Sequence, residues 1–152
     1  MLTEQQICGV YVPVVTPFNA AGEIDLDSYQ RYVKKILTHS IQGLVVNGTT
    51  GESPTVNINE LQLLVNASRE LLKSTSIPLV VGTGTNDTRS TVARTELAAN
   101  LGADAALVVV PYYSRPSQEG IIAHFRKAAE VGVPIIAYDI PGRTGVGLTV
   151  DT

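Results

Sequence analysis

The sequence is poor in residues that several classes of protein depend on. Cys8 is its single cysteine, so no disulfide can form within the chain. Lys and Arg number 11 against 14 Asp and Glu, and the net charge is −3. That balance argues against a nucleic-acid-binding face, which needs clustered basic side chains. Cysteine and histidine also lack the spacing of a metal site, so we expect no metal.

Long apolar runs and targeting features are scarce as well. No apolar run approaches the roughly 20 residues of a transmembrane helix, which predicts no membrane contact. Residues 1–6 have neither the basic nor the apolar region of a signal peptide. The 152 residues correspond to one domain, and a hydrophobic fraction of 44% is enough for a packed core. These features predict a soluble, cytoplasmic protein.

Five short apolar segments without alternation are typical of strands that are buried on both faces in a parallel sheet. They are residues 10–15, 44–46, 78–81, 106–110 and 135–138. The segments between them have helical spacing of apolar residues. Asp25 is a predicted N-cap, and Asn57 with Glu60 forms a predicted capping box. A third helix is expected over residues 91–101, with Gly102 in the left-handed conformation after it.

The fourth helix has a predicted cap at Ser117 and a predicted end at Gly132. Its expected buried side chains are Ile121, Ile122, Phe125 and Ala129.

Two architectures fit this alternation of strands and helices, an open doubly wound sheet and a (β/α)8 barrel. The open sheet usually has a G-x-G-x-x-G turn after its first strand, whereas residues 16–18 contain no glycine. Polar and aromatic residues follow the predicted strands, where a barrel has its chemistry. We therefore predict an α/β fold of the (β/α)8 TIM barrel type. Since such a barrel needs about 250 residues, residues 1–152 are expected to be the N-terminal part of a single, incomplete barrel domain of about five βα units.

Residues 47–53, after the second predicted strand, combine two glycines with the hydroxyls of Thr49 and Thr50. Glycine lets the backbone turn tightly and present its N–H groups, which suits a carboxylate or phosphate. A polar turn without function is the alternative interpretation. A Walker-type phosphate loop is disfavoured because no lysine follows the second glycine.

Two further strand ends carry chemically useful side chains. Tyr112 and Tyr113 follow the fourth predicted strand, and Tyr138 ends the fifth, with Arg143 on the next loop. A tyrosine hydroxyl is a competent proton relay, and Arg binds carboxylates through two hydrogen bonds. Each segment alone could be a packing feature or a turn. Three such segments at strand ends favour a site for a small acidic molecule.

The remaining candidates are weaker. His39 and His124 are expected at the surface rather than as ligands. Cys8 precedes the first predicted strand and is expected to be a small apolar filler rather than a nucleophile.

The strand-end segments resemble the dihydrodipicolinate synthase group of the N-acetylneuraminate lyase family, which are class I pyruvate aldolases. The matching pieces are residues 48–53, 111–120 and 138–145, and the likeness runs from Val12 to the end of the chain. Arg143 is the most specific feature, since sialate lyases of the family typically lack it. The resemblance implies a Schiff-base lyase that condenses pyruvate with L-aspartate-4-semialdehyde to give 4-hydroxy-tetrahydrodipicolinate, on the route to diaminopimelate and lysine. It also implies a homo-oligomer, a dimer or tetramer.

The resemblance assigns roles residue by residue. Tyr138 resembles the tyrosine that hydrogen-bonds and protonates the Schiff-base intermediate, and Thr49 and Tyr113 resemble its proton-relay partners. Thr50 resembles the residue that holds the pyruvate carboxylate. Arg143 resembles the residue that binds the semialdehyde carboxylate. No cofactor is implied beyond the covalent imine with pyruvate.

In the family, the Schiff-base lysine lies on the sixth strand, which corresponds to a position beyond Thr152. The lysines present are all on predicted helices and are Lys34, Lys35, Lys73 and Lys127. We therefore expect the chain alone to be inactive and not stably folded. In a five-stranded piece, Val14, Val46 and Val109 are expected to face the barrel interior and to lose packing partners.

Two other functions remain open at this point. One is a different pyruvate-dependent keto-acid aldolase of the same family, and the other is a non-catalytic half-barrel that acts in assembly. The resemblance also implies weak feedback inhibition by L-lysine. Ile58 and Ser90 stand where regulated members have an effector-binding histidine and glutamate, although Asn86 and Tyr112 match the effector-site pattern.

Overall fold

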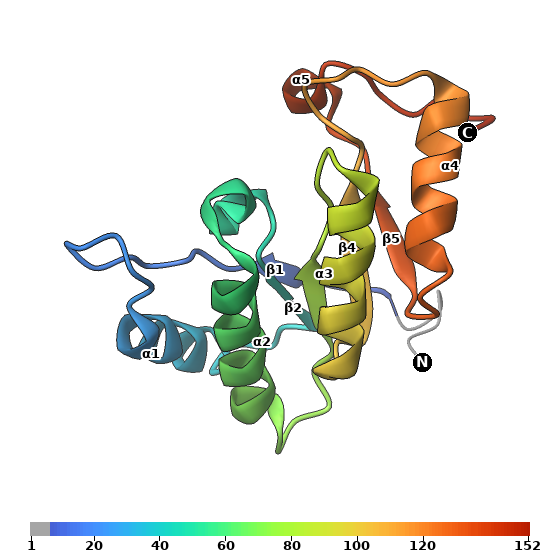
Figure 1. The fold of residues 1–152 in the computed structure, drawn as a ribbon. Coiled ribbons are helices and arrows are strands. Elements are labelled where there is room, and N and C mark those ends of the chain that lie inside the picture. The colour runs from blue at the N-terminus through green and yellow to red at the C-terminus, as the bar shows by residue number, and fades with distance from the viewer. Residues whose placement is uncertain (1–6) are drawn as a thin grey trace.

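The computed structural model describes residues 7–152, which contain a five-stranded parallel sheet in the order β1-β2-β3-β4-β5 (Figure 1). Each strand pairs with the next one along the chain. The strands are β1 (Tyr11–Pro13), β2 (Gly43–Val46), β3 (Leu79–Gly82), β4 (Ala105–Val109) and β5 (Ile135–Tyr138). All five predicted strands are therefore confirmed.

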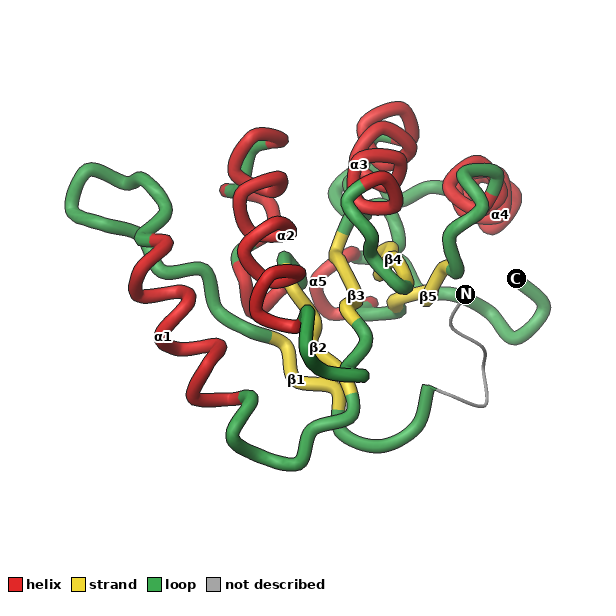
Figure 2. Tube along the Cα trace, turned by 90° about the horizontal axis from the view of Figure 1, so that it is seen from below, coloured by secondary structure: helices red, strands yellow, loops and turns green. Residues whose placement is uncertain are grey.

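Helices follow the strands and lie along one face of the sheet, which Figure 2 shows as an arc of helices outside the strands. These helices are α1 (Leu26–Ile36), α2 (Ile58–Leu72), α3 (Thr88–Asn100) and α4 (Gln118–Ala129). The 3-10 turns η2 (Thr49–Gly51) and η3 (Ser53–Thr55) lie in the loop after β2, and the short α5 (Pro141–Thr144) lies in the loop after β5. A doubly wound sheet has helices on both faces. Sequential strand order with helices on one face is the arrangement of a (β/α) barrel, as predicted.

The predicted helix caps are present. The Asp25 side chain accepts a hydrogen bond from the Ser28 N–H at 2.9 Å. Asn57 Oδ1 accepts from the Glu60 N–H at 3.1 Å, while Glu60 Oε2 accepts from the Asn57 N–H at 2.8 Å, which completes the capping box. Gly102 has φ +86° after α3, as expected for a left-handed helix end.

The third helix begins earlier than predicted. Asp87 is its N-cap, because Asp87 Oδ2 accepts a hydrogen bond from the Ser90 N–H at 2.8 Å. The helix therefore starts at Thr88 rather than Thr91. The hydroxyl of Thr91 lies inside the first turns and accepts from the Thr85 N–H at 2.9 Å.

The sheet separates two groups of buried side chains. On the helix side, Val14, Leu44 and Val46 pack with α1 and α2 in the main core. On the other face, Val45 and Val80 cluster with residues of β4 and β5. Val14 and Val46 therefore do not face the barrel interior, and that prediction is wrong. Successive strand residues point to opposite faces, so the interior position in β2 belongs to Val45.

The inner face of the sheet is only partly covered. Leu107, Val109 and Ile136 are half-buried there, and Val15 is exposed. Within residues 7–152, β1 and β5 each pair on one side only. The concave face and both sheet edges are thus the surfaces on which further barrel strands would pack.

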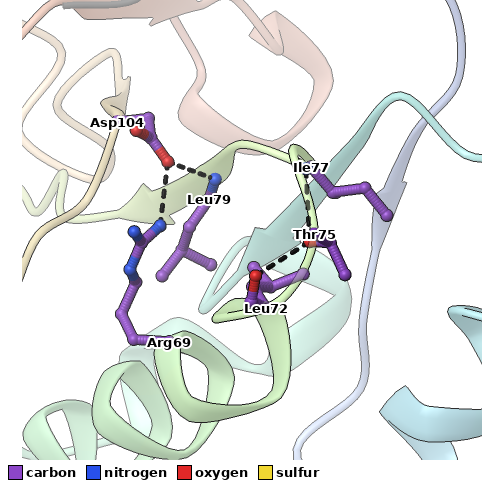
Figure 3. Close-up of polar contacts among 6 residues, drawn as sticks. All are labelled: Arg69, Leu72, Thr75, Ile77, Leu79 and Asp104. Carbon is purple, nitrogen blue, oxygen red and sulfur yellow. Dashed lines mark hydrogen bonds and ion pairs between the residues drawn. The ribbon is translucent and has the colours of Figure 1, made fainter.

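Polar contacts join the elements at the N-terminal end of the sheet (Figure 3). Asp104 Oδ2 accepts from the backbone N–H of Leu79 at 2.8 Å and forms an ion pair with Arg69 at 3.0 Å. Thr75 Oγ1 accepts from the Ile77 N–H at 3.2 Å and donates to the last turn of α2. This network lies opposite the polar strand-end loops, where barrel residues serve stability.

The structure corrects two surface predictions. His124 is 3% exposed and not at the surface, because α4 turns Ile121, His124 and Ala128 toward its neighbours, while Ala129 is exposed. Cys8 is exposed and fills no apolar space. His39 is exposed, as expected.

Candidate functional site

The loops after β2, β4 and β5 meet at the C-terminal edge of the sheet and enclose a cleft of about 440 Å³. Small-molecule sites typically have volumes of about 300–1,000 Å³, so the cleft has a suitable size. The lining residues are Thr49, Ser53, Pro54, Val109, Tyr112, Tyr113, Ile140, Arg143 and Thr144.

Three of the five predicted site residues line this cleft, namely Thr49, Tyr113 and Arg143. Thr50 is exposed beside Thr49 in η2 and is not part of the lining. Tyr138 is half-buried at the end of β5, paired in register with the lining residue Val109. In the described part of the chain, no hydrogen bond joins the hydroxyls of Thr49, Tyr113 and Tyr138. The proton relay that the resemblance implies therefore remains a prediction.

One backbone carbonyl group accepts two of the hydrogen bonds that shape the loop after β2. The oxygen of Gly48 accepts hydrogen bonds from the N–H groups of Gly51 at 3.0 Å and Ser53 at 3.3 Å. The hydroxyl of Thr16, which follows β1, donates to the Gly51 oxygen at 2.7 Å in a buried position. These bonds hold Thr49 at the cleft wall between the ends of β1 and β2.

The loop after β4 contains an exposed tyrosine whose backbone has an energetically unfavourable positive φ. Tyr113 is 90% exposed and has φ +71°, and Arg115 has φ +47°. Side chains other than glycine rarely adopt this region, at a cost of about 1–3 kcal/mol each, and such positions cluster at functional sites. A Cβ at Gly145 would lie 2.8 Å from Arg115 Nε, so this loop packs closely against the loop after β5.

The loop after β5 forms α5, which begins at Pro141 and ends at Gly145 with φ +76°. The buried Thr144 hydroxyl lies 2.6 Å from the Val146 oxygen and 3.1 Å from the Ile140 oxygen, which anchors the turn from inside. Arg143 is exposed on the outer side of this turn, and within residues 7–152 it forms no ion pair. A guanidinium in that position is suited to binding a carboxylate.

The lysine side chains do not line the cleft. Lys73 pairs with Glu70 at 3.7 Å and Lys127 with Glu130 at 2.8 Å, both on exposed surfaces. Lys34 and Lys35 lie in the last turn of α1. Residues 7–152 contain no cluster of three or more His, Cys, Asp or Glu side chains that could hold a metal ion. In the same range, no helix combines the length and apolar character needed to cross a bilayer.

Other lining residues had no role assigned from the sequence. Ser53 and Thr144 lie within strand-end segments, but nothing in their local sequence distinguishes a lining side chain from a turn residue. Val109 and Ile140 are apolar, and their place in the wall depends on how the loops fold over the sheet. Adjacency to a strand end is the signal that could have identified them.

Comparison with known proteins places the chain among a set of related enzymes. A family model described as the Dihydrodipicolinate synthetase family matches residues 6–152. The 4-hydroxy-tetrahydrodipicolinate synthase of Bifidobacterium animalis subsp. lactis is 47% identical over 140 residues, covering 91% of this chain and 45% of that protein. Dihydrodipicolinate synthase of Thermotoga maritima has a similar structure, with a TM-score of 0.87, 45% identity, and coverage of 92% of this chain and 47% of that one.

A further solved structure is the chloride-inhibited dihydrodipicolinate synthase of Acinetobacter baumannii, complexed with pyruvate. It gives a TM-score of 0.90 at 39% identity and covers 94% of this chain and 49% of that one. The chain spans about half the length of the curated relatives it matches. These relatives are lyases with a TIM-barrel fold, and the five strands correspond to the N-terminal part of that barrel. The chain belongs to the dihydrodipicolinate synthetase family.

Proposed function

We propose that the protein containing this chain condenses pyruvate with L-aspartate-4-semialdehyde to give 4-hydroxy-tetrahydrodipicolinate. The observation that supports this most directly is the common cleft of Thr49, Tyr113 and Arg143, which come from the loops after β2, β4 and β5. Both substrates carry a carboxylate, which suits a guanidinium and a loop rich in N–H groups. The names of the curated relatives agree with this reaction.

The chemistry that we propose runs through a covalent imine without a metal or an organic cofactor. A lysine amine attacks C2 of pyruvate and water leaves, which forms the imine. Loss of a proton from C3 then gives an enamine, whose C3 bonds to the aldehyde carbon of the second substrate. The amino group of that substrate then attacks the imine carbon, which closes the ring and releases the lysine amine. Lys34, Lys35 and Lys127 lie on helices and Lys73 directly follows α2. None of them lines the cleft, so we assign the amine to a residue beyond Thr152.

The residues of this chain then bind and transfer protons. Tyr138, Thr49 and Tyr113 are assigned to a relay that protonates the alkoxide formed from the aldehyde, because hydroxyls at strand ends can pass protons in this way. Thr50 and the N–H groups around it are assigned to the pyruvate carboxylate. Arg143 is assigned to the carboxylate of the semialdehyde.

We further propose that the protein acts as a homo-oligomer, a dimer or tetramer, in which Tyr113 reaches the site of a neighbouring subunit. The support is that this side chain is 90% exposed while its backbone holds a costly φ of +71°. Sedimentation of the complete natural polypeptide containing residues 1–152 tests the assembly, and a Tyr113→Ala variant tests the contact. A monomer with full activity would contradict it.

Arg143→Ala tests the substrate assignment most directly. Loss of a charge-assisted hydrogen bond costs about 1.5–3 kcal/mol, so the KM for the semialdehyde should rise by one to two decades while the KM for pyruvate stays within twofold. Arg126→Ala, an exposed arginine on α4 outside the cleft, is the matched control.

The same assay separates the two alternatives. If an uncharged aldehyde reacts as well as the semialdehyde, another keto-acid aldolase is the better assignment. If the complete polypeptide forms no borohydride-trapped adduct with pyruvate, the better assignment is a non-catalytic half-barrel that acts in assembly.

A further inference from the structure

Asn47 lies between the end of β2 and the loop that carries Thr49, but it does not line the cleft. Its side chain is buried, and its φ of +58° is in the left-handed region, which asparagine adopts more readily than most residues. Any influence of Asn47 on the site is therefore exerted from inside the protein.

Asn47 is fixed to β3 by its side chain and by its backbone. Its Nδ2 donates a buried hydrogen bond of 2.7 Å to the backbone oxygen of Gly82, the last residue of β3. A Cβ at Gly82 would lie 2.0 Å from the backbone oxygen of Asn47. The β3 backbone thus packs directly against Asn47, which only a glycine at position 82 permits.

The conformation of Asn47 sets the direction of the residues that follow. Gly48 is the next residue, and its oxygen accepts the hydrogen bonds from Gly51 and Ser53 that shape the loop. Thr49, which lines the cleft, is attached directly to Gly48. A change in the backbone at Asn47 would therefore move the whole loop relative to the cleft.

The type of side chain at this position indicates that a donor is required. Asn47 Oδ1 is buried and has no hydrogen-bond partner, which is a cost that native proteins rarely accept without a compensating role. An ionised aspartate tolerates the left-handed conformation as well, but it only accepts hydrogen bonds and cannot bind the Gly82 oxygen. The Nδ2 donor is the part of the side chain that the structure uses.

We infer that Asn47 is a positioning residue, whose bond to Gly82 holds residues 48–51 in the orientation that receives the pyruvate carboxylate. This inference rests on the proposed function for the identity of the ligand. It assigns a distinct effect on pyruvate binding to a residue that touches no substrate.

Asn47→Gly, in the complete natural polypeptide containing residues 1–152, is the primary test. Glycine keeps the positive φ and removes the donor. The pyruvate concentration for half-maximal borohydride trapping should rise about tenfold, as expected for one lost buried hydrogen bond, while the KM for the acceptor aldehyde stays within twofold. Asn57→Ala is the matched control, because it removes an exposed helix cap near the same loop and should lower the melting temperature without changing pyruvate trapping.

The outcomes separate this inference from the proposed function. Wild-type protein that traps pyruvate but does not use the semialdehyde contradicts the proposed function and leaves the Asn47 measurement valid. Unchanged trapping in Asn47→Gly, beside an active wild type, overturns the inference alone. Wild-type protein that traps no pyruvate overturns both.

Asn47→Asp gives a second test that does not depend on the glycine variant folding. A protonated carboxyl group can donate to the Gly82 oxygen, and burial raises the pKa of such a group. Pyruvate trapping by this variant, relative to wild type at each pH, should therefore improve as the pH falls from about 8 to about 5.5. A ratio independent of pH would overturn the positioning role.

Discussion

The Nδ1 atom of His124 on α4 lies 2.9 Å from the hydroxyl of Thr88, the first residue of α3. This partly buried contact joins two neighbouring helices, while His124 Nε2 is buried without a partner. Burial lowers the pKa of the His124 imidazole below its usual value of 6.5, and the nearby carboxylate of Asp87 opposes the shift. Protonation of the folded state is therefore unfavourable at this position.

We expect stability to depend on pH through His124. In the unfolded chain the His124 imidazole binds a proton at about pH 6.5, whereas in the folded chain it binds the proton only at lower pH. The contribution is thus fully present above about pH 6.5 and is lost as the pH falls toward the folded-state pKa. His124→Gln should flatten the decline in melting temperature between about pH 7 and pH 5, and His39→Gln, an exposed control, should not. Equal slopes in wild type and His124→Gln would refute this.

The two contacts of the Asp104 carboxylate, with the Leu79 N–H and with Arg69, should contribute unequally to the free energy of unfolding. Asp104→Ala leaves the N–H of the buried Leu79 without its acceptor, which costs about 1–3 kcal/mol. Arg69→Ala removes only an ion pair whose side chains are 38% and 37% exposed, worth about 0–1 kcal/mol after solvent screening. Denaturant unfolding of both variants measures the difference. A larger loss for Arg69→Ala would contradict this assignment.

Tyr138→Phe should reduce turnover much more than pyruvate affinity. The substitution removes the hydroxyl and keeps the ring, and proton transfer by a positioned group contributes about 10²–10⁴-fold to rate. Steady-state kinetics of the complete polypeptide with varied pyruvate tests the role. Tyr32→Phe on α1, also partly buried, is the control and should keep full turnover. A normal kcat for Tyr138→Phe would remove the tyrosine from the relay.

L-lysine should inhibit the complete enzyme weakly or not at all. We expect this because Ser90 supplies no anion to pair with the effector's ammonium at the position where the resemblance implies a glutamate. Both its N–H and its hydroxyl bond to Asp87. One missing charge-assisted bond corresponds to about 1.5–3 kcal/mol, or one to two decades in affinity. Ser90→Glu should strengthen inhibition in a lysine titration of the condensation reaction. Micromolar inhibition of the wild type would contradict the expectation.

The isolated 152-residue chain should neither trap pyruvate nor unfold cooperatively as a monomer. Its inner face leaves Val15 exposed, with Leu107 and Ile136 half-buried, and each large apolar side chain kept from burial forfeits about 1.5–3 kcal/mol. Domain stability is only about 5–15 kcal/mol in total. Mass spectrometry after borohydride treatment with pyruvate should show the unmodified mass. A fold-dependent adduct on any of the four lysines would overturn this.

Features set by near neighbours in the chain could be predicted from sequence, and those set by distant contacts could not. The capping box of Asn57 and Glu60 spans three residues, so its pattern is visible locally. The sequence does not show which face of the sheet Val46 occupies, because a strand that is apolar on both sides has no alternation between polar and apolar residues. The burial of His124 depends on α3, which lies far away in the chain.

The candidate site also combines features that the sequence predicts with features that only the fold determines. Thr49, Tyr113 and Arg143 could be selected because each follows a strand end, and the ends of parallel strands meet at one edge. Tyr113 has a left-handed backbone, and Tyr138 is not among the residues that line the cleft. Both features depend on how the loops pack, which residue types do not specify. Asn47 lies within the predicted strand-end segment 47–53, but only its bond to Gly82 shows what its side chain does.

The two outer strands differ in their tendency to associate with other chains. The Val14 N–H points to β2, at 3.0 Å from the Val45 oxygen, so the neighbouring position 13 faces the free edge. Proline at that position has no N–H to offer to an incoming strand. The free edge of β5, Ile135–Tyr138, contains neither proline nor a charged residue. Uncontrolled aggregation of preparations should therefore begin at β5, and a charged substitution such as Ala137→Lys is the change that should improve solubility.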